Sequence, residues 1–266
     1  MFQKPLNAVA MLLLFLFLAP SVQAQSGREI MQLVEDRDTG EDAVMTMRMT
    51  LVSKDGQQRL REMESFRKSK GEDTWSLIFF KEPADVRNTG FLTYDYDAEG
   101  ADDDQFMYLP ALRKIKRIAG SDKAGSFMGS DFNYSDMSAP DLADFEFKYL
   151  QDAEVDGSKT WVVLGTPKST DVMEEIGYSK KAVWVRQDNH MVVRVKAWVH
   201  RSKEVKFFEF KGLEEIEGVW FARRAQASRK LGNLTLHQTL IEYNDIQLNQ
   251  GLEDDLFTQR RLEKGL

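Results

Sequence analysis

One stretch decides the fold class: residues 44–51 read Val-Met-Thr-Met-Arg-Met-Thr-Leu. Apolar side chains recur there at every second position, which is the period of a β-strand with two distinct faces. The apolar face of this strand carries Met45, Met47, Met49 and Leu51. Asp55-Gly56 follows as a strong hairpin signal, so we expect the chain to fold back into a second strand over residues 58–69.

Strand-like runs continue along the rest of the chain, separated by turn signals rather than by helices. They cover residues 75–80, 91–96, 105–109, 112–118, 145–150, 160–164, 182–186, 191–199, 205–210, 219–227 and 234–243. Meandering strands of this kind predict a single antiparallel sheet and a mainly β (α+β) fold. A sheet of about ten or more strands cannot stay flat, so it curls or closes.

The interior of such a curled sheet needs something to fill it, because more than about eight strands leave more room than the strand side chains occupy. Ser26 and Glu29 form a capping box, which predicts a short amphipathic helix over residues 27–36. This helix and residues 138–144 are the candidate plugs. The remaining space is expected to be apolar and available to a guest molecule.

Composition excludes much enzyme chemistry. The chain of 266 residues has no Cys, which excludes disulfides, thiolate metal sites and Cys nucleophiles, and it has only three His. Lys and Arg number 36 against 43 Asp and Glu, a net charge of −7 that argues against a general nucleic-acid binder. No motif predicts a catalytic residue, a metal site or a cofactor, and we expect a non-enzyme.

The N-terminus has the features of a secretory signal peptide. Lys4 precedes an apolar run over residues 8–19, and small residues at Val22 and Ala24 suit cleavage by signal peptidase. The run of about 12 residues is too short to span a hydrocarbon core of about 30 Å. We therefore expect residues 1–24 to be removed and residues 25–266 to form one soluble, monomeric domain outside the cytoplasm.

Several stretches resemble the outer-membrane lipoprotein-sorting family, the LolA/LolB-like proteins, and in particular a branch of longer, uncharacterised members. They are FFKEP at 79–83 with GFLTY at 90–94, YLPALRKIKRI at 108–118, GSFMGSDFNYSDM at 125–137 and DLFTQRRLE at 255–263. The resemblance implies a strongly curved, half-open β-barrel with short helices in its concave mouth. It also implies a carrier of lipid or lipoprotein acyl chains. Members of the branch resemble proteins encoded beside RND-type lipid exporters, which implies a transporter partner.

Two groups of residues are the candidate lining of an acyl-chain cavity. The first is the face of Met45, Met47, Met49 and Leu51, because flexible Met side chains suit variable apolar shapes. The second is Phe127, Met128, Phe132 and Met137 in the glycine-rich loop of residues 120–137. Both groups also fit ordinary barrel core. The loop is either a gate over the cavity mouth or an ordered structural loop in which Ser130 and Asp131 cap backbone groups.

A basic segment stands out in this acidic chain, formed by Arg113, Lys114, Lys116 and Arg117. It could contact anionic headgroups or an acidic partner surface. It also fits a solvated strand face that discourages edge pairing.

The leading hypothesis is a periplasmic carrier of acyl chains directed toward the outer membrane. The alternatives are an accessory or sensor module that binds and regulates a transporter or another protein, and a hydrolase with an unusual site.

Overall fold

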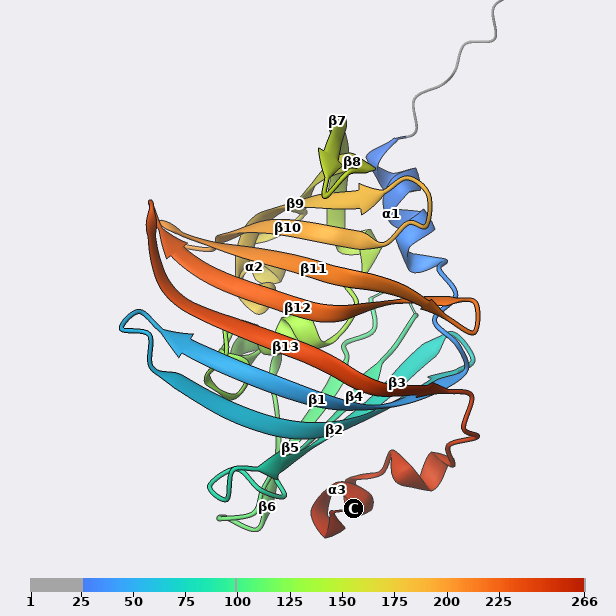
Figure 1. Cartoon of the computed structure of the whole chain (residues 1–266), viewed down its shortest axis with the longest axis vertical. Coiled ribbons are helices and arrows are strands. Elements are labelled where there is room, and N and C mark those ends of the chain that lie inside the picture. The colour runs from blue at the N-terminus through green and yellow to red at the C-terminus, as the bar shows by residue number, and fades with distance from the viewer. Residues whose placement is uncertain (1–25, 99, 266) are drawn as a thin grey trace, which may run out of the picture.

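The structure is a computed structural model that describes residues 26–98 and 100–265 (Figure 1). The predicted signal peptide, residues 1–24, lies outside the described residues. Thirteen strands form one sheet in which every neighbouring pair is antiparallel. The strands are β1 (Asp42–Ser53), β2 (Gln58–Lys70), β3 (Asp73–Glu82), β4 (Gly90–Asp95), β5 (Asp104–Leu109), β6 (Lys114–Arg117), β7 (Phe145–Val155), β8 (Ser158–Pro167), β9 (Tyr178–Arg186), β10 (Val192–Val199), β11 (Glu204–Ile216), β12 (Val219–Leu231) and β13 (Leu234–Leu248).

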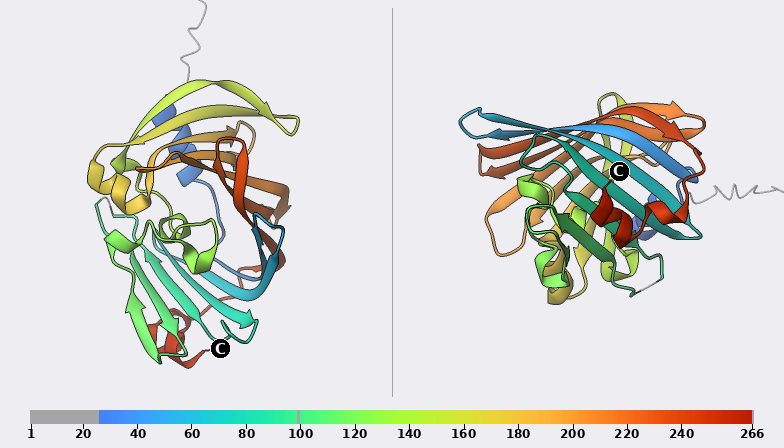
Figure 2. Two further views of the ribbon diagram at one scale, coloured as in Figure 1. Left: turned by 90° about the vertical axis from the view of Figure 1, so that its left-hand side faces the viewer. Right: turned by 90° about the horizontal axis from the view of Figure 1, so that it is seen from below.

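The strand order is β6-β5-β4-β3-β2-β1-β13-β12-β11-β10-β9-β8-β7. Strands β6 and β7 are the two edges, so the sheet is curved but not closed (Figure 2). The predicted strands are all present, and the strongly curved, half-open barrel is confirmed. Strand β1 lies beside β13, which joins the first half of the chain to the last.

The helices are short and lie on both sides of the sheet. They are α1 (Gly27–Glu35), α2 (Thr170–Ile176), α3 (Gln259–Lys264) and the 3₁₀ turns η1 (Gly120–Asp122), η2 (Phe127–Gly129), η3 (Tyr134–Met137), η4 (Leu142–Asp144) and η5 (Asp254–Leu256). The predicted capping box of α1 is present, with the Ser26 amide donating to Glu29 and the Glu29 amide donating to Ser26. Helix α1 packs with η4 against β7 and β8 inside the curve, as predicted for these two plugs.

Helix α1 approaches β7 closely because its first residue is glycine. A Cβ atom at Gly27 would lie 2.8 Å from the Lys148 carbonyl carbon and 2.8 Å from the Tyr149 nitrogen, so a larger residue would push the helix off the strand.

Alternation along the strands separates a concave from a convex cluster of apolar side chains. The concave cluster includes Met45, Met47, Met49, Leu51, Met63, Phe80, Phe91, Phe127, Phe132 and Phe208. The convex cluster includes Phe66, Leu77, Phe79, Leu92, Phe257 and Leu262. Neighbouring residues of β3 divide between the two, since Phe79 belongs to one and Phe80 to the other. Helix α3 packs against β4, β5 and β6, and Phe257 and Leu262 join the convex cluster, so this part of the sheet carries buried apolar side chains on both sides.

One internal segment crosses the concave side. Residues 118–144 link edge strand β6 to edge strand β7 and contain the four turns η1–η4. We call these residues the crossing segment. In Figure 2 the segment lies within the curve of the sheet rather than outside it. The curled sheet is therefore filled in part by its own chain, where the sequence predicted free space for a guest.

Candidate functional site

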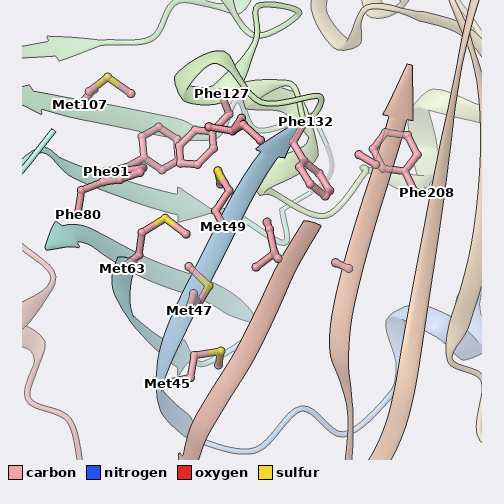
Figure 3. Close-up of a cluster of buried hydrophobic side chains, with 14 of the residues drawn as sticks. Met45, Met47, Met49, Met63, Phe80, Phe91, Met107, Phe127, Phe132 and Phe208 are labelled. Atoms are coloured by element: carbon pink, nitrogen blue, oxygen red, sulfur yellow. The ribbon is translucent and has the colours of Figure 1, made fainter. Parts of the chain in front are cut away.

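The four predicted residues of β1 face the concave side, as the strand period predicts. Met49 and Leu51 are fully buried, and Met45 and Met47 are 9% and 7% exposed. In Figure 3, Met49 lies beside the rings of Phe91 and Phe127, and Met47 and Met45 follow along the strand away from them. The structure thus brings the Met face and the loop residues of the prediction into one cluster. Whether an acyl chain enters this cluster stays a prediction.

The crossing segment contributes two buried rings to the same cluster. Phe127 packs edge-on against Phe91 with ring centroids 5.1 Å apart, and Phe132 packs against Phe208 at 5.6 Å (Figure 3). Between them the chain turns through a left-handed residue at Met128, which is half-buried. Met137 is also half-buried and packs against the cluster. These rings fill interior space that would otherwise be available to a ligand.

Apolar side chains that are only half-buried extend the concave cluster along β11–β13. They are Phe210, Ile216, Phe221, Tyr243 and Ile246. Tyr243 lies directly opposite Met47 in the pairing of β13 with β1, so this surface is continuous with the Met face. Burial raises the pKa of the Tyr243 hydroxyl to about 12, which keeps the group neutral at any ordinary pH. The concave side therefore keeps partly accessible apolar surface beyond the crossing segment.

Polar contacts hold the rim of the crossing segment to the sheet. The Arg61 guanidinium of β2 donates to the Met128 carbonyl, and the Gln105 amide of β5 donates to the Tyr134 carbonyl at 3.0 Å. The Tyr178 hydroxyl of β9 donates to Asp136 at 2.7 Å. These contacts reach the segment from both halves of the sheet, so its backbone is ordered while its rings fill the interior.

Buried Lys123 ties the same segment to α2. Its ammonium donates to Glu175 at 2.5 Å. Gly177 caps the C-terminal end of α2 with φ +79°. A Cβ atom at this position would lie 2.8 Å from the side-chain amide nitrogen of Asn133. Only glycine adopts this left-handed conformation without strain while leaving room for Asn133.

A polar pocket of about 640 Å³ lies where the segment meets the ends of β11–β13. Asp131 is one of its lining residues: its Oδ2 lies 2.6 Å from His237 Nδ1 and accepts from the Thr239 hydroxyl at 2.8 Å. The Asp131 amide donates to Thr239 Oγ1 at 2.9 Å. Buried Lys206 donates to the Asp131 carbonyl and to Asn133 Oδ1, both at 2.7 Å. Burial lowers the pKa of this ammonium.

No motif in the sequence predicts the contact between Asp131 and His237, because the two residues are 106 positions apart. The only local signal is the placement of His237 and Thr239 on one face of a strand. The fold, and not any spacing along the sequence, thus gives His237 a carboxylate partner. The hydrogen bonds of the described residues give His237 no serine partner, so a Ser-His-Asp arrangement is not formed there.

The predicted basic segment lies at a sheet edge. Lys114, Lys116 and Arg117 belong to edge strand β6, and Arg113 lies in the turn before it. Lys116 pairs with Asp122 at 2.9 Å and Arg117 with Asp104 at 2.6 Å, both at exposed positions. Charged residues on an edge strand discourage pairing with another chain, which fits the structural interpretation. Contact with a headgroup or partner stays a prediction.

The described part of the chain contains no helix that is both long and apolar enough to cross a membrane. Within the described residues no group of three or more Asp, Glu or His side chains is placed to hold a metal ion.

Comparisons with known proteins agree with this fold. Residues 72–264 match a family model described only as an uncharacterized protein. A domain from Vibrio parahaemolyticus named for outer-membrane lipoprotein sorting is 28% identical, with a TM-score of 0.80 over 89% of this chain and 98% of that one. A DUF1329 family protein from Desulfovibrio piger is also 28% identical, with a TM-score of 0.80 over 89% and 97% of the two chains.

A LolA superfamily protein from Nitrosomonas europaea shares the fold at 17% identity, with a TM-score of 0.66 over 89% of this chain and 99% of that one. No curated protein sequence matches the chain. The chain belongs to the family matched over residues 72–264, and its structural neighbours are outer-membrane lipoprotein-sorting and LolA superfamily proteins.

Proposed function

We propose that this protein carries the acyl chains of a lipid or lipoprotein on the concave side of its sheet, without covalent chemistry. The observation that carries this proposal is the concave apolar surface itself: flexible Met side chains adjoin half-buried Phe210, Phe221 and Tyr243, and the crossing segment packs on part of the same cluster. A curved sheet face with accessible apolar side chains is typical of a ligand-binding surface. The structural neighbours named for lipoprotein sorting support the same interpretation.

The energetics favour an acyl ligand. Burying a chain of about 16 carbons gains roughly 12 kcal/mol at about 0.8 kcal/mol per CH₂. Displacing one buried Phe ring from the concave cluster costs about 1.5–3 kcal/mol. The crossing segment can therefore yield some of its apolar contacts to a guest, and the unbranched Met side chains can adjust to the guest's shape.

The location and direction of this activity are part of the proposal. We propose that cleavage after Ala24 releases the mature chain into the periplasm, where it moves acyl chains toward the outer membrane. An RND-type exporter in the inner membrane is the proposed donor or acceptor. Exposed Arg113 and Lys114, at the start of edge strand β6, provide a charged surface for such a contact.

A fluorescent 16-carbon fatty acid titrated into delipidated protein tests the proposal. Phe210→Gln removes apolar surface from the concave side and should weaken binding by about tenfold, because about 1–2 kcal/mol of contact is lost. Phe207→Gln is the matched control, since Phe207 lies on the same strand, is also half-buried and faces the other side. Equal effects of the two variants, or no binding by the unaltered protein, would contradict the proposal and favour the non-carrying accessory module.

A further inference from the structure

The polar pocket concentrates positive charge in an acidic protein. Its lining includes the cations Arg59, Arg201, Lys206 and Arg229 and the carboxylates Asp131, Glu174 and Glu204. Four positive and three negative charges leave a local balance of +1 with neutral histidines, against a net charge of −7 for the chain. The lining of the pocket is thus opposite in sign to the net charge of the chain.

The three carboxylates already have partners. Glu174 pairs with Arg201 at 2.5 Å, and Asp131 is held by His237 and Thr239. Glu204 lies 3.7 Å from Arg229. Among the described residues, neither Arg59 nor Lys206 has a carboxylate within 4.0 Å. Within the described residues, these two cations of the pocket therefore form no direct ion pair.

Lys206 is the more telling of the two because it is only 6% exposed. Its ammonium donates to two neutral oxygens, the Asp131 carbonyl and the Asn133 amide oxygen, and so retains a third donor. The ammonium also lies 5.5 Å from the centroid of the Tyr178 ring, and Asp136 and Asp131 attract it from beyond ion-pair distance. A buried cation without a carboxylate in direct contact is costly, and an anion that binds it directly lowers that cost. His200, on the same lining, has a buried Nε2 without a hydrogen-bond partner.

We propose that this pocket binds a phosphate-type anion, with Lys206 at its inner end and Arg59 and Arg229 at its rim. A phosphate monoester brings up to two negative charges and three terminal oxygens, which suits several cationic donors better than the single charge of a carboxylate. The volume of about 640 Å³ leaves room for atoms attached to the phosphate. Where the anion is the headgroup of the carried lipid, the inference rests on the proposed function.

The neighbouring residues connect this pocket to the apolar interior. Asp131 faces the pocket, whereas the next residue, Phe132, packs on Phe208 in the concave cluster. Lys206 and Phe208 alternate with Phe207 along β11, so both point to the concave side. An anionic headgroup on Lys206 would thus start an acyl chain beside the Phe132 ring.

Calorimetric titration in low-salt buffer tests the inference with two probes, inorganic phosphate and a short-chain phosphatidic acid. Arg59→Gln and Arg229→Gln should each weaken phosphate binding by about three- to tenfold, and Lys206→Met by more than about tenfold. Arg48→Gln is the matched control, because Arg48 is an exposed arginine of β1 outside the pocket, and it should change binding by less than about twofold. The two arginine variants keep the test decisive if Lys206→Met does not fold.

The two probes distinguish the sources of the anion. Tighter binding of phosphatidic acid than of phosphate, weakened by both Arg229→Gln and Phe210→Gln, supports a lipid headgroup. Arginine-dependent binding of phosphate without any gain from the acyl chains supports a soluble phosphate compound. Absence of phosphate binding, or equal binding by Arg48→Gln and Arg229→Gln proteins, overturns the inference. Fatty-acid binding without phosphate binding would defeat this inference alone, and phosphate binding without fatty-acid binding would defeat the proposed function alone.

Discussion

Phe132→Ala should destabilise the protein and yet tighten its binding of an acyl chain. Phe132 is 6% exposed and packs on Phe208 inside the concave cluster, so its loss should lower the free energy of unfolding by about 3–5 kcal/mol. A ligand that enters the cluster must displace this ring in the unaltered protein, at about 1.5–3 kcal/mol. Removing the ring removes that competition, and binding should tighten by about 10- to 100-fold.

The assay combines chemical unfolding with titration of the fluorescent 16-carbon fatty acid. Phe79→Ala is the control, since Phe79 is 2% exposed but lies in the convex cluster under α3. It should cost similar stability and leave the affinity unchanged. If Phe132→Ala binds no more tightly than Phe79→Ala, the crossing segment does not compete with a ligand, and our placement of the ligand is wrong.

Three further predictions concern the scaffold. Gly27→Ala should lower the unfolding free energy by about 1–3 kcal/mol in a denaturant titration, because its Cβ would collide with the β7 backbone; an unchanged midpoint would contradict the close packing of α1. Phe257→Ala should lower the free energy of unfolding by about 3–5 kcal/mol, because Phe257 is 1% exposed in the convex cluster. Full retention of stability would show that the C-terminal segment does not pack there. Burial, followed by repulsion from Asp103, raises the pKa of Asp95 to about 7, so this group destabilises the fold increasingly from about pH 4 to 7. Asp95→Asn keeps an acceptor for the Ala139 amide and should remove this loss of stability, so the free energy of unfolding should rise by up to about 4 kcal/mol above pH 7. Parallel curves of stability against pH for the two proteins would refute the raised pKa of Asp95.

The strand pattern could be predicted because its signal is local. Residues 45–51 alternate strictly, and a one-residue shift would expose the whole Met face, so the buried side follows directly from the sequence. The capping box at Ser26 fixed the start of α1 in the same way.

The C-terminal helix on the convex side of the sheet was harder to predict than the strands. Nothing local in residues 259–264 indicates that helix α3 packs on the convex side against β4, β5 and β6. A signal for this cover is present in β3, where Leu77 to Phe80 form an unbroken apolar run. Strands of that kind are buried on both faces and therefore require a covering element on each.

The candidate site depends on contacts that span long distances along the chain. Asp131 reaches Thr239 across 108 positions, and Lys206 reaches the Asp131 carbonyl across 75. No periodicity or motif encodes such pairs, because they follow from the path of the crossing segment over the curved sheet. The sequence therefore identified the apolar residues of the interior but not the polar pocket beside them.

Mass spectrometry of the lipids extracted from natively purified mature protein tests the carrier account most directly. We expect close to one equivalent of an acyl lipid per protein, and less in a Phe210→Gln protein than in its Phe207→Gln control. Protein that purifies without acyl lipid, and that also fails to bind the fluorescent fatty acid after delipidation, would contradict the account.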